Sequence, residues 1–286
     1  MKKLELKAYG KINLGLDVIG TLPNKYHDLR MIMQTVGIYD TVVMEKRNDG
    51  QIVISTNLEG LPNDERNLAY KAARLLMDEF KITEGVTITI DKVIPMAGGM
   101  AGGSADCAAV LKGMNSLFDL KLNEKELMAR GVNLGADVPY CITGGTVLAE
   151  GIGDRLTKLP PVPNAYIIIA KPGVSVSTKY VYDKIDSVEI KNHPDTEAMI
   201  NAINKKDLHE LAGLIRNVLE DVTVKEYSAI NDIKQTMLEG GALNAMMSGS
   251  GPTVFGIFDD RKKAKETLKT IKEQKLAEQL YITEFV

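Results

Sequence analysis

Alternation of apolar and polar residues predicts several strands in the first third of the chain. The clearest case is VTITID over 86–91, where valine and isoleucine alternate with threonine and aspartate. Because successive side chains of a strand point to opposite faces of a sheet, this pattern is typical of a strand with one buried face. Similar segments predict further strands over 4–8, 11–19, 41–46 and 51–55.

Apolar residues at intervals of three and four predict the first helix, over 64–80. Its apolar face comprises Leu68, Ala72, Leu75, Leu76 and Phe80. Asn63 or Asp64 is expected to cap this helix, because a short polar side chain can accept from the unpaired N–H groups of a first turn.

Two further helices are predicted from their first residues. One begins at Ser104, which is expected to be its cap, and runs to Phe118. The other covers 124–133, where Asn123 and Glu126 have the spacing of a capping box.

Three prolines in the segment LPPVPN, at 159–164, indicate a boundary between two domains. Before it, we expect a loop over 135–139 and a strand near 145–150. After it, the pattern predicts strands over 165–170, 243–247, 252–258 and 279–285, and helices over 178–185, 195–204, 207–219, 225–239 and 260–274. Strands and helices mix without regular βαβ alternation. The sequence therefore predicts an α+β fold with two lobes, residues 1–158 and residues 159–286.

Composition narrows the possible function classes. The 286 residues are 44% hydrophobic and 26% charged, with a formal net charge of −3. These values are typical of a globular chain and unlike those of disordered, collagen-like or membrane proteins. The charge does not favour nucleic acid, and no apolar run approaches the roughly 20 residues of a membrane span. We therefore expect neither a nucleic-acid partner nor a membrane partner.

The cysteines and the N-terminal segment indicate a compartment. Cys107 and Cys141 have no neighbouring Cys or His, which argues against a zinc site and against a disulfide framework. The first residues, MKKLELKAYGKINLGL, contain lysines but lack the apolar core of a signal peptide. The sequence thus predicts a cytoplasmic protein in a reducing environment.

A glycine-rich stretch, PMAGGMAGG at 95–103, lies between a predicted strand and a predicted helix. Glycine permits tight turns and lets the backbone approach a ligand, and the unpaired N–H groups of the following helix favour an anion. The stretch predicts phosphate binding, with a flexible loop before an ordinary serine cap as the alternative. It is not a Walker loop, because neither G-x-x-x-x-G-K-[ST] nor G-x-G-x-x-G occurs. Positive charge must come from elsewhere in the chain or from Mg²⁺.

Several other residues have two interpretations when each is taken alone. Asp137 in GADVPY is either a catalytic carboxylate or a turn residue. Lys11 has apolar neighbours, although most strand lysines are solvated, and Tyr26-His27 follows a turn-rich segment. The segment SGSG at 248–251 is either a tight turn or, with the first glycine-rich stretch, part of one cleft.

Four ordered motifs together resemble the GHMP kinases over essentially the whole chain. They are AYGKINLGLDVIG (8–20) followed by YHDLRMIMQTV (26–36), IPMAGGMAGGSADCAAVL (94–111), GADVPYCITGG (135–145) and MMSGSGPTVFGIF (246–258). The GKINLGL and YHDL pair is similar to the branch that serves the non-mevalonate isoprenoid pathway. The resemblance implies a ribosomal protein S5 domain 2-like N-terminal domain and a ferredoxin-like C-terminal domain.

The resemblance also implies a reaction, the transfer of the ATP γ-phosphoryl group to the 2-hydroxyl of 4-diphosphocytidyl-2-C-methyl-D-erythritol. By similarity, Lys11 and Asp137 are catalytic: Asp137 takes the hydroxyl proton, and the adjacent Lys11 keeps Asp137 ionised and neutralises charge at the reacting oxygens. Mg²⁺ is expected to arrive with ATP rather than in a dedicated protein cage. The implied ATP-binding residues are Pro95, Met96, Ala97, Gly98, Gly99, Met100, Ala101, Gly102, Gly103, Ser104 and Ala105.

Four residues are expected to bind the second substrate. Tyr26 and Tyr182 could stack on the cytosine ring, and His27 could donate or accept at its edge. Tyr180 could take the place of Tyr182, from which it is two residues away. Asn13, beside the catalytic lysine in sequence, is a candidate donor for the diphosphate.

One position departs from the family pattern, which usually has two adjacent serines at the end of the phosphate loop. Here they are Ser104 and Ala105, so the second hydroxyl is absent. Asp106 follows where the family carries Asp or Asn, and its role is open.

The protein is expected to be a monomer or a weak homodimer. Two other functions remain as alternatives. One is a protein that binds nucleotide without catalysis, and the presence of both Lys11 and Asp137 argues against it. The other is a GHMP kinase for homoserine or mevalonate, and Tyr26-His27 argues against that.

Overall fold

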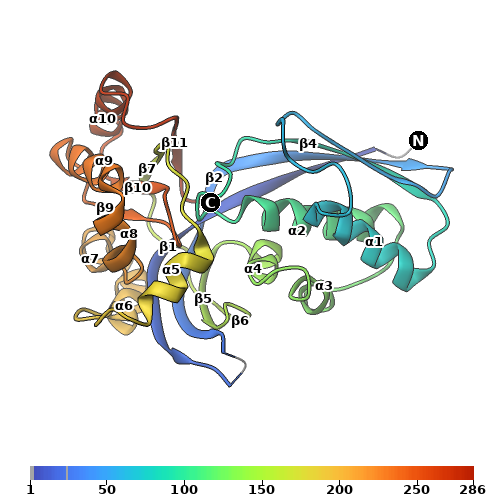
Figure 1. The fold of residues 1–286 in the computed structure, drawn as a ribbon, viewed down its shortest axis with the longest axis horizontal. Coiled ribbons are helices and arrows are strands. Elements are labelled where there is room, and N and C mark those ends of the chain that lie inside the picture. Colours follow the sequence, from blue (N-terminus) through green and yellow to red (C-terminus); the bar gives the residue numbers. More distant parts are fainter. Residues whose placement is uncertain (1–2, 24) are drawn as a thin grey trace. The chain divides into compact units, whose positions relative to one another are not determined.

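The computed structural model describes residues 3–23 and 25–286 (Figure 1). Its contacts divide the chain into two units. The first contains the chain up to Gly10 with Ile38–Ile94 and Ala101–Gly144, and the second contains Lys11–Gly37, Pro95–Met100 and Gly145–Val286. Neither unit is one continuous stretch of sequence. A domain boundary between 158 and 159 therefore stays a prediction.

The sheet of the first unit contains parts of two long strands and two shorter ones. β1 (Lys3–Thr21) and β2 (His27–Arg47) contribute to both units, while β3 (Ile52–Thr56) and β4 (Gly85–Asp91) lie in the first alone. β4 pairs antiparallel with β2 and parallel with β3. The strands predicted over 4–8 and 11–19 are one continuous strand, because Gly10 continues the extended backbone instead of ending it.

Four helices are described in the first unit, namely α1 (Leu68–Phe80), α2 (Gly102–Leu117), α3 (Glu124–Gly131) and α4 (Val138–Thr143). α1 and α2 pack side by side (Figure 1). A glycine allows α2 to approach the sheet closely, since a Cβ at Gly113 would overlap the sulfur of Met44 on β2. The predicted Asn123–Glu126 capping box is confirmed at α3, with N···O distances of 3.0 and 2.7 Å.

One expectation for these helices is wrong, and another holds only in part. Asn67, not Asn63 or Asp64, caps α1 and accepts from Ala69 N at 2.9 Å. The expected loop over 135–139 is present at 135–137, but α4 already begins at Val138. Its Pro139 lies in the first helical turn, where a missing N–H costs no intrahelical hydrogen bond.

A four-stranded sheet forms the centre of the second unit in the part of the chain that is described. Its strands are β7 (Tyr166–Lys171), β9 (Asn244–Met247), β10 (Val254–Phe258) and β11 (Gln279–Glu284), in the order β11-β7-β10-β9 and all antiparallel. The helices α9 (Ser228–Glu239) and α10 (Arg261–Glu273) pack on it. Side chains buried here include Ile167, Ile168, Ile169, Phe255, Ile257, Met237 and Ile271.

The second unit also contains parts of β1 and β2, short strands that extend their sheet, and four helices. β5 (Thr146–Gly151) pairs with β2, β6 (Arg155–Lys158) pairs with β5, and β8 (Arg216–Asn217) runs parallel to β1. The helices are α5 (Thr178–Ile185), α6 (Thr196–Lys205), α7 (Leu208–Leu214) and α8 (Glu220–Glu226). No helix in the described ranges combines the length and apolar character that crossing a membrane requires.

Two helices expected in this region are interrupted. The one predicted over 207–219 ends at Leu214, because the chain then pairs with β1 through Arg216 and Gly15. The one predicted over 225–239 is divided between α8 and α9 at Tyr227. The α+β class is confirmed.

Candidate active site

Lys11 lies on the part of β1 that belongs to the second unit, and it is only 4% exposed. Its Nζ donates to Asn13 Oδ1 at 2.8 Å and to the Gly99 carbonyl oxygen at 2.9 Å. Residues two apart on a strand share a face, which places Asn13 beside the ammonium. A buried ammonium is costly without acceptors, so these two oxygens hold the charged form in one position. Lys11 is therefore not an ordinary solvated strand lysine.

Asn13 is fully buried and contacts Lys11 through its oxygen. Its Nδ2 donates to Met31 Sδ at 3.4 Å. A thioether is a weak acceptor, so this amide group retains capacity to donate to a stronger one.

The first half of the predicted phosphate loop packs on the second glycine-rich segment. The Ser248 hydroxyl donates to the Gly99 carbonyl oxygen at 3.0 Å, and a Cβ at Gly99 would overlap the Ser248 carbonyl oxygen. The φ of Gly99 is +74°, a region that favours glycine. Position 99 therefore requires glycine because the 248–251 segment packs against its backbone, and not because a ligand needs the space. Residues 248–251 form the expected turn between β9 and β10.

The second half of the predicted phosphate loop belongs to the first unit and starts α2. Ala101, with φ of +59°, is the residue before the helix, and Ala105 N donates to its carbonyl oxygen at 2.8 Å. Ser104 is the third helical residue, so its expected role as the cap is wrong. The reason is the left-handed backbone at Ala101, which begins the helix two residues earlier.

Asp137 lies in the first unit, immediately before α4. Its carboxylate makes no capping hydrogen bond to that helix, and it is half-buried. A Cβ at Gly135 would lie 3.7 Å from the Ser104 hydroxyl, so the loop carrying Asp137 passes beside the start of α2. The structure therefore brings this loop and Ser104 together, and it leaves the carboxylate unused by the helix that it precedes.

A buried charged cluster in the first unit was not predicted from the sequence. Lys92 forms ion pairs with Asp40 and with Asp106, the latter at 2.6 Å, and all three side chains are at most 4% exposed. Asp40 Oδ1 also accepts from the backbone of Val93 at 2.6 Å and Ile94 at 2.8 Å. The cluster fixes the end of β4 against the first turns of α2. Its members are far apart in sequence, and no local pattern indicated them.

Burial and charge shift the titration of two members of this cluster. Burial raises the pKa of Asp106 to about 7, partly offset by Lys92 and reinforced by Asp40. Burial lowers the pKa of Lys92, but the charges of Asp106 and Asp40 outweigh it and raise this pKa above its ordinary value. One ammonium serves two carboxylates, and Asp106 Oδ1 has no hydrogen-bond partner among the described residues. Asp106 therefore binds a proton more readily than an ordinary aspartate does.

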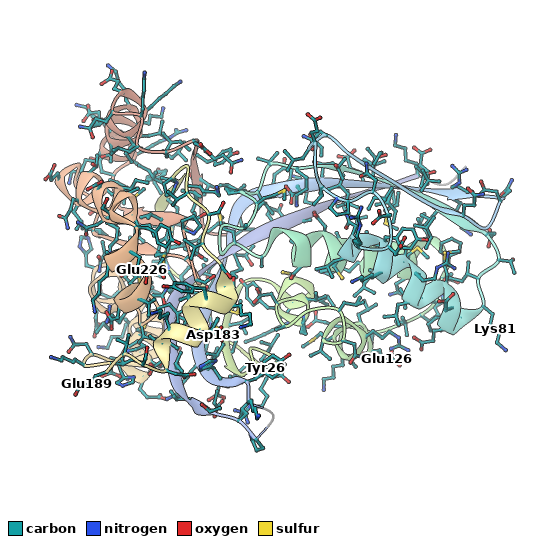
Figure 2. All side chains as sticks on the ribbon, in the orientation of Figure 1. Tyr26, Lys81, Glu126, Asp183, Glu189 and Glu226 are labelled. Atoms are coloured by element: carbon teal, nitrogen blue, oxygen red, sulfur yellow. The ribbon has the colours of Figure 1, made fainter. Side chains whose placement is uncertain are left out.

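Two of the residues expected at the cytidine end lie together in the second unit. The rings of His27 and Tyr182 have centroids 5.0 Å apart and planes tilted by 35°. His27 Nε2 lies 2.9 Å from Asp186 Oδ1. Tyr26, labelled in Figure 2, is 63% exposed between β1 and β2.

Tyr180 has a different environment from Tyr182. Its hydroxyl donates at 2.7 Å to Glu226, at the end of α8 (Figure 2), and this bond raises the pKa of Tyr180 above its ordinary value. Of the two tyrosines, only Tyr182 has a described ring contact with His27.

Comparison with known proteins defines the class to which this fold and these motifs belong. Residues 67–145 match the GHMP kinases N terminal domain, and residues 199–275 match the GHMP kinases C terminal domain. The chain belongs to the GHMP kinases. Within the GHMP kinases it belongs to the same family as the relatives that match it over nearly its full length. Two of these are named 4-diphosphocytidyl-2-C-methyl-D-erythritol kinase. The one from Lachnospira eligens is 51% identical over 99% of both chains, and the one from Acetivibrio thermocellus is 53% identical over 92% of this chain and 93% of the relative.

Solved structures agree with this assignment. The crystal structure of a 4-(cytidine 5'-diphospho)-2C-methyl-D-erythritol kinase matches with a TM-score of 0.83 and 27% identity, and the match covers 99% of both chains. The mevalonate kinase of L. major matches with a TM-score of 0.79 at 18% identity, which shows a shared fold.

Proposed function

We infer that this chain phosphorylates the 2-hydroxyl of 4-diphosphocytidyl-2-C-methyl-D-erythritol with ATP, in the non-mevalonate isoprenoid precursor pathway. The observation that carries this function is the similarity, over nearly the whole chain, to kinases named for that substrate. The paired rings of His27 and Tyr182 add support, because a cytosine base offers both a face for stacking and an edge for hydrogen bonding.

Lys11 is proposed as the catalytic cation. Its ammonium is buried and held by Asn13 and the Gly99 carbonyl, which together use two of its three N–H donors. Phosphoryl transfer has a loose transition state, so fixed positive charge and positioning supply most of the catalysis. A cation held in one position costs no reorganisation when charge develops on the transferring oxygens.

Asp137 is proposed as the group that takes the proton of the substrate hydroxyl. The hydroxyl oxygen bonds to the γ-phosphorus, the bond to the β,γ-bridging oxygen breaks, and the proton passes to the carboxylate. A carboxylate is a weak base for an alcohol, but it suffices where the proton leaves late. The absence of a capping bond to α4 leaves its oxygens available for that role.

Residues 95–105 are proposed to bind the phosphates of ATP, with Ser104 as a hydroxyl contact to phosphate or metal. Mg²⁺ commonly binds through one or two carboxylates together with substrate phosphates, so we propose that it enters with ATP. Bound there, it would neutralise charge on the β- and γ-phosphates. Among residues 3–23 and 25–286, no group of three or more His, Cys, Asp or Glu residues is placed to hold a metal ion.

Tyr26, His27 and Tyr182 are proposed to hold the cytidine, and Asn13 to donate to the diphosphate. Asn13 suits this role because, among the described hydrogen bonds, its Nδ2 donates only to a thioether.

We further propose that the enzyme is cytoplasmic and that it is a monomer or a weak homodimer. Light scattering over a concentration series would test the oligomeric state.

A coupled ADP-release assay tests the function directly. Purified chain is supplied with ATP, Mg²⁺ and, in separate reactions, the cytidyl alcohol, mevalonate and homoserine. We expect turnover with the cytidyl alcohol alone, and phosphorus NMR should place the new phosphate on the 2-hydroxyl. Preferential turnover of mevalonate or homoserine would replace the proposed substrate, and no turnover with any of the three would favour nucleotide binding without catalysis.

A further inference from the structure

The turn at 248–251 is closed by its own backbone hydrogen bonds, but these bonds do not fix its position relative to β1. Gly249 and Gly251 have φ values of +57° and +84°. Glycine has the largest conformational freedom to lose in such a turn. Ser248 N donates to the Thr253 carbonyl oxygen at 2.8 Å, and Gly251 N donates to the Ser248 carbonyl oxygen at 3.0 Å.

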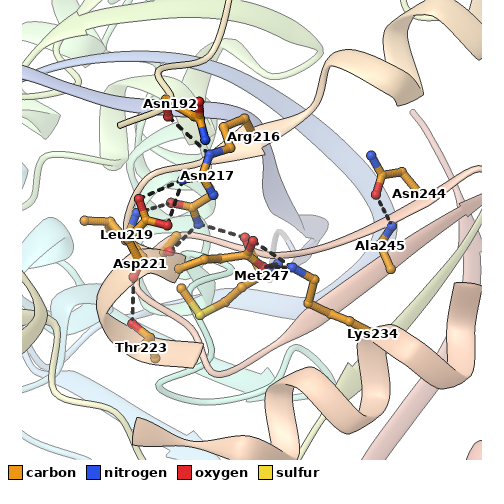
Figure 3. Close-up of polar contacts among 12 residues, drawn as sticks. Asn192, Arg216, Asn217, Leu219, Asp221, Thr223, Lys234, Asn244, Ala245 and Met247 are labelled. Atoms are coloured by element: carbon orange, nitrogen blue, oxygen red, sulfur yellow. Dashed lines mark hydrogen bonds and ion pairs between the residues drawn. The ribbon is translucent and has the colours of Figure 1, made fainter. Parts of the chain in front are cut away.

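Asn217, fully buried at the end of β8, holds this turn from outside. Its Nδ2 donates to the carbonyl oxygens of Met247 and Gly249, both at 2.8 Å, and its Oδ1 accepts from Leu219 N at 3.0 Å. Figure 3 shows Asn217 among Leu219 and Met247 at these contacts. The amide therefore binds the residues on both sides of Ser248 and ties them to the start of α8.

A second residue of the same segment holds the strand that leads into the turn. Glu220 Oε1 accepts from Met247 N at 2.8 Å, and Lys234 on α9 donates to both Glu220 oxygens at 2.7 and 2.8 Å. Lys234 and Met247 are labelled in Figure 3. Met247 thus has both backbone groups bound by side chains from the segment 217–220. Two independent anchors on one residue fix the position from which the turn begins.

The 248–251 turn also contacts Lys11 and the Gly99 carbonyl oxygen that accepts from it. Ser248 donates to the same Gly99 carbonyl oxygen that accepts from Lys11. A Cβ at Gly249 would lie 3.5 Å from Lys11 Nζ. A shift of the turn would therefore move the Gly99 carbonyl and alter the space around the ammonium.

We propose that Asn217 is a positioning residue for phosphoryl transfer, which sets the 248–251 turn and through it the Gly99 carbonyl and the Lys11 ammonium. This inference rests on the proposed function, because it concerns the position of Lys11, which is proposed to act in that reaction. Asn217 touches neither the lysine nor the Gly99 carbonyl among the described hydrogen bonds. Its effect passes through the backbone of the turn.

The test compares Asn217→Asp with Thr223→Val. Aspartate has the shape of asparagine but replaces its N–H donors with an oxygen that repels the Met247 and Gly249 carbonyls. Thr223 is also fully buried nearby, and its hydroxyl donates only to the Leu219 carbonyl, at 3.1 Å, among the described contacts. At a temperature where both variants are folded, we expect Asn217→Asp to lower kcat by about 10- to 100-fold with a much smaller change in KM for ATP. Thr223→Val should lower Tm and leave kcat unchanged.

A second variant keeps the proposal testable if Asn217→Asp does not fold. Ser248→Ala removes only the hydroxyl that links the turn to Gly99, and it should also lower kcat. In the double variant the two losses should not add, because both act through one contact. Wild-type kcat in folded Asn217→Asp, or in Ser248→Ala, would overturn the proposal. Wild-type enzyme without activity on the cytidyl alcohol would instead refute the proposed function.

Discussion

Lys92 and Asp106 form a buried ion pair, 2.6 Å between Nζ and Oδ2, that joins the end of β4 to the first turns of α2. The second carboxylate of the cluster, Asp40, competes for the same ammonium and also accepts from two backbone N–H groups. Asp40 therefore accepts more hydrogen bonds than Asp106, whose Oδ1 is buried without a described partner.

The first prediction concerns stability and pH. The pKa of Asp106 is raised from 3.8 to about 7, so between these values the folded chain keeps a proton that the unfolded chain loses. This contribution to stability is fully present below pH 3.8 and is lost as pH rises through about 7. Asp106→Asn should remove that slope, which for one proton is at most about 1.4 kcal/mol per pH unit.

Urea unfolding at several pH values from 4 to about 8 would measure it. Asp78→Asn is a matched control, because Asp78 is an exposed aspartate paired with Arg74 on α1. The free energy difference between wild type and Asp106→Asn should change across the window, and that of the control should not. A difference that is constant with pH would contradict the raised pKa.

The second prediction concerns Asp137. Since its carboxylate does not cap α4, Asp137→Asn should leave Tm unchanged. It should lower kcat by about 100-fold or more, because a general base commonly contributes about 10²- to 10⁴-fold, and leave the Kd for ATP nearly unchanged. Steady-state kinetics and calorimetry would measure both. A variant that keeps near wild-type kcat would remove Asp137 from the catalytic step.

The third prediction concerns the phosphate loop. Of the glycines in α2, Gly103 has the most room for a side chain, since a Cβ there would lie 3.8 Å from Leu68 Cδ1, an ordinary van der Waals contact. Gly103→Ala should preserve or slightly raise Tm, because alanine is the better helix former. ATP affinity should fall by about tenfold, or about 1.4 kcal/mol, if the phosphates approach this backbone.

Gly213→Ala on α7 provides the control. A Cβ at Gly213 would meet nothing within 4 Å, so that variant tests the helix effect of alanine without the loop. Calorimetric titration with ATP would compare the two. Equal ATP affinity in Gly103→Ala and wild type would place the phosphates away from the start of α2.

Local sequence signals predicted the elements that depend on local interactions. The capping box at Asn123 and Glu126 is made by residues three apart, and α5 has the predicted bounds because Ser177 caps it and its apolar residues repeat at helical spacing. Lys11 and Asn13 share a face for the same reason, because strand periodicity relates residues two apart. The motif AYGKINLGL therefore contains two residues that the structure places in contact, while their roles stay predictions.

Elements that depend on distant partners were not predicted. β8 interrupts an expected helix because Arg216 and Asn217 pair with β1, about 200 positions away in sequence. The left-handed Ala101 displaced the expected Ser104 cap, since alanine has no local preference for that region. The Asp40–Lys92–Asp106 cluster and the contacts of Asn217 join residues from separate elements, so no spacing in the sequence indicates them.

The last prediction separates the two tyrosines of α5 that were candidates for stacking on cytosine. Tyr182 contacts the His27 ring, whereas the Tyr180 hydroxyl is bound to Glu226. Stacking on an aromatic ring is commonly worth about 1–3 kcal/mol per base, so Tyr182→Leu should raise KM for the cytidyl alcohol by about 5- to 150-fold. KM for ATP should stay nearly constant, because the change affects the cytidine end alone.

Tyr180→Leu is the matched control on the same helix and should change neither KM. Steady-state kinetics with each substrate varied in turn would measure both. A larger effect at Tyr180 would reassign the stacking residue, and a rise in KM for ATP alone in Tyr182→Leu would place the cytidine away from His27.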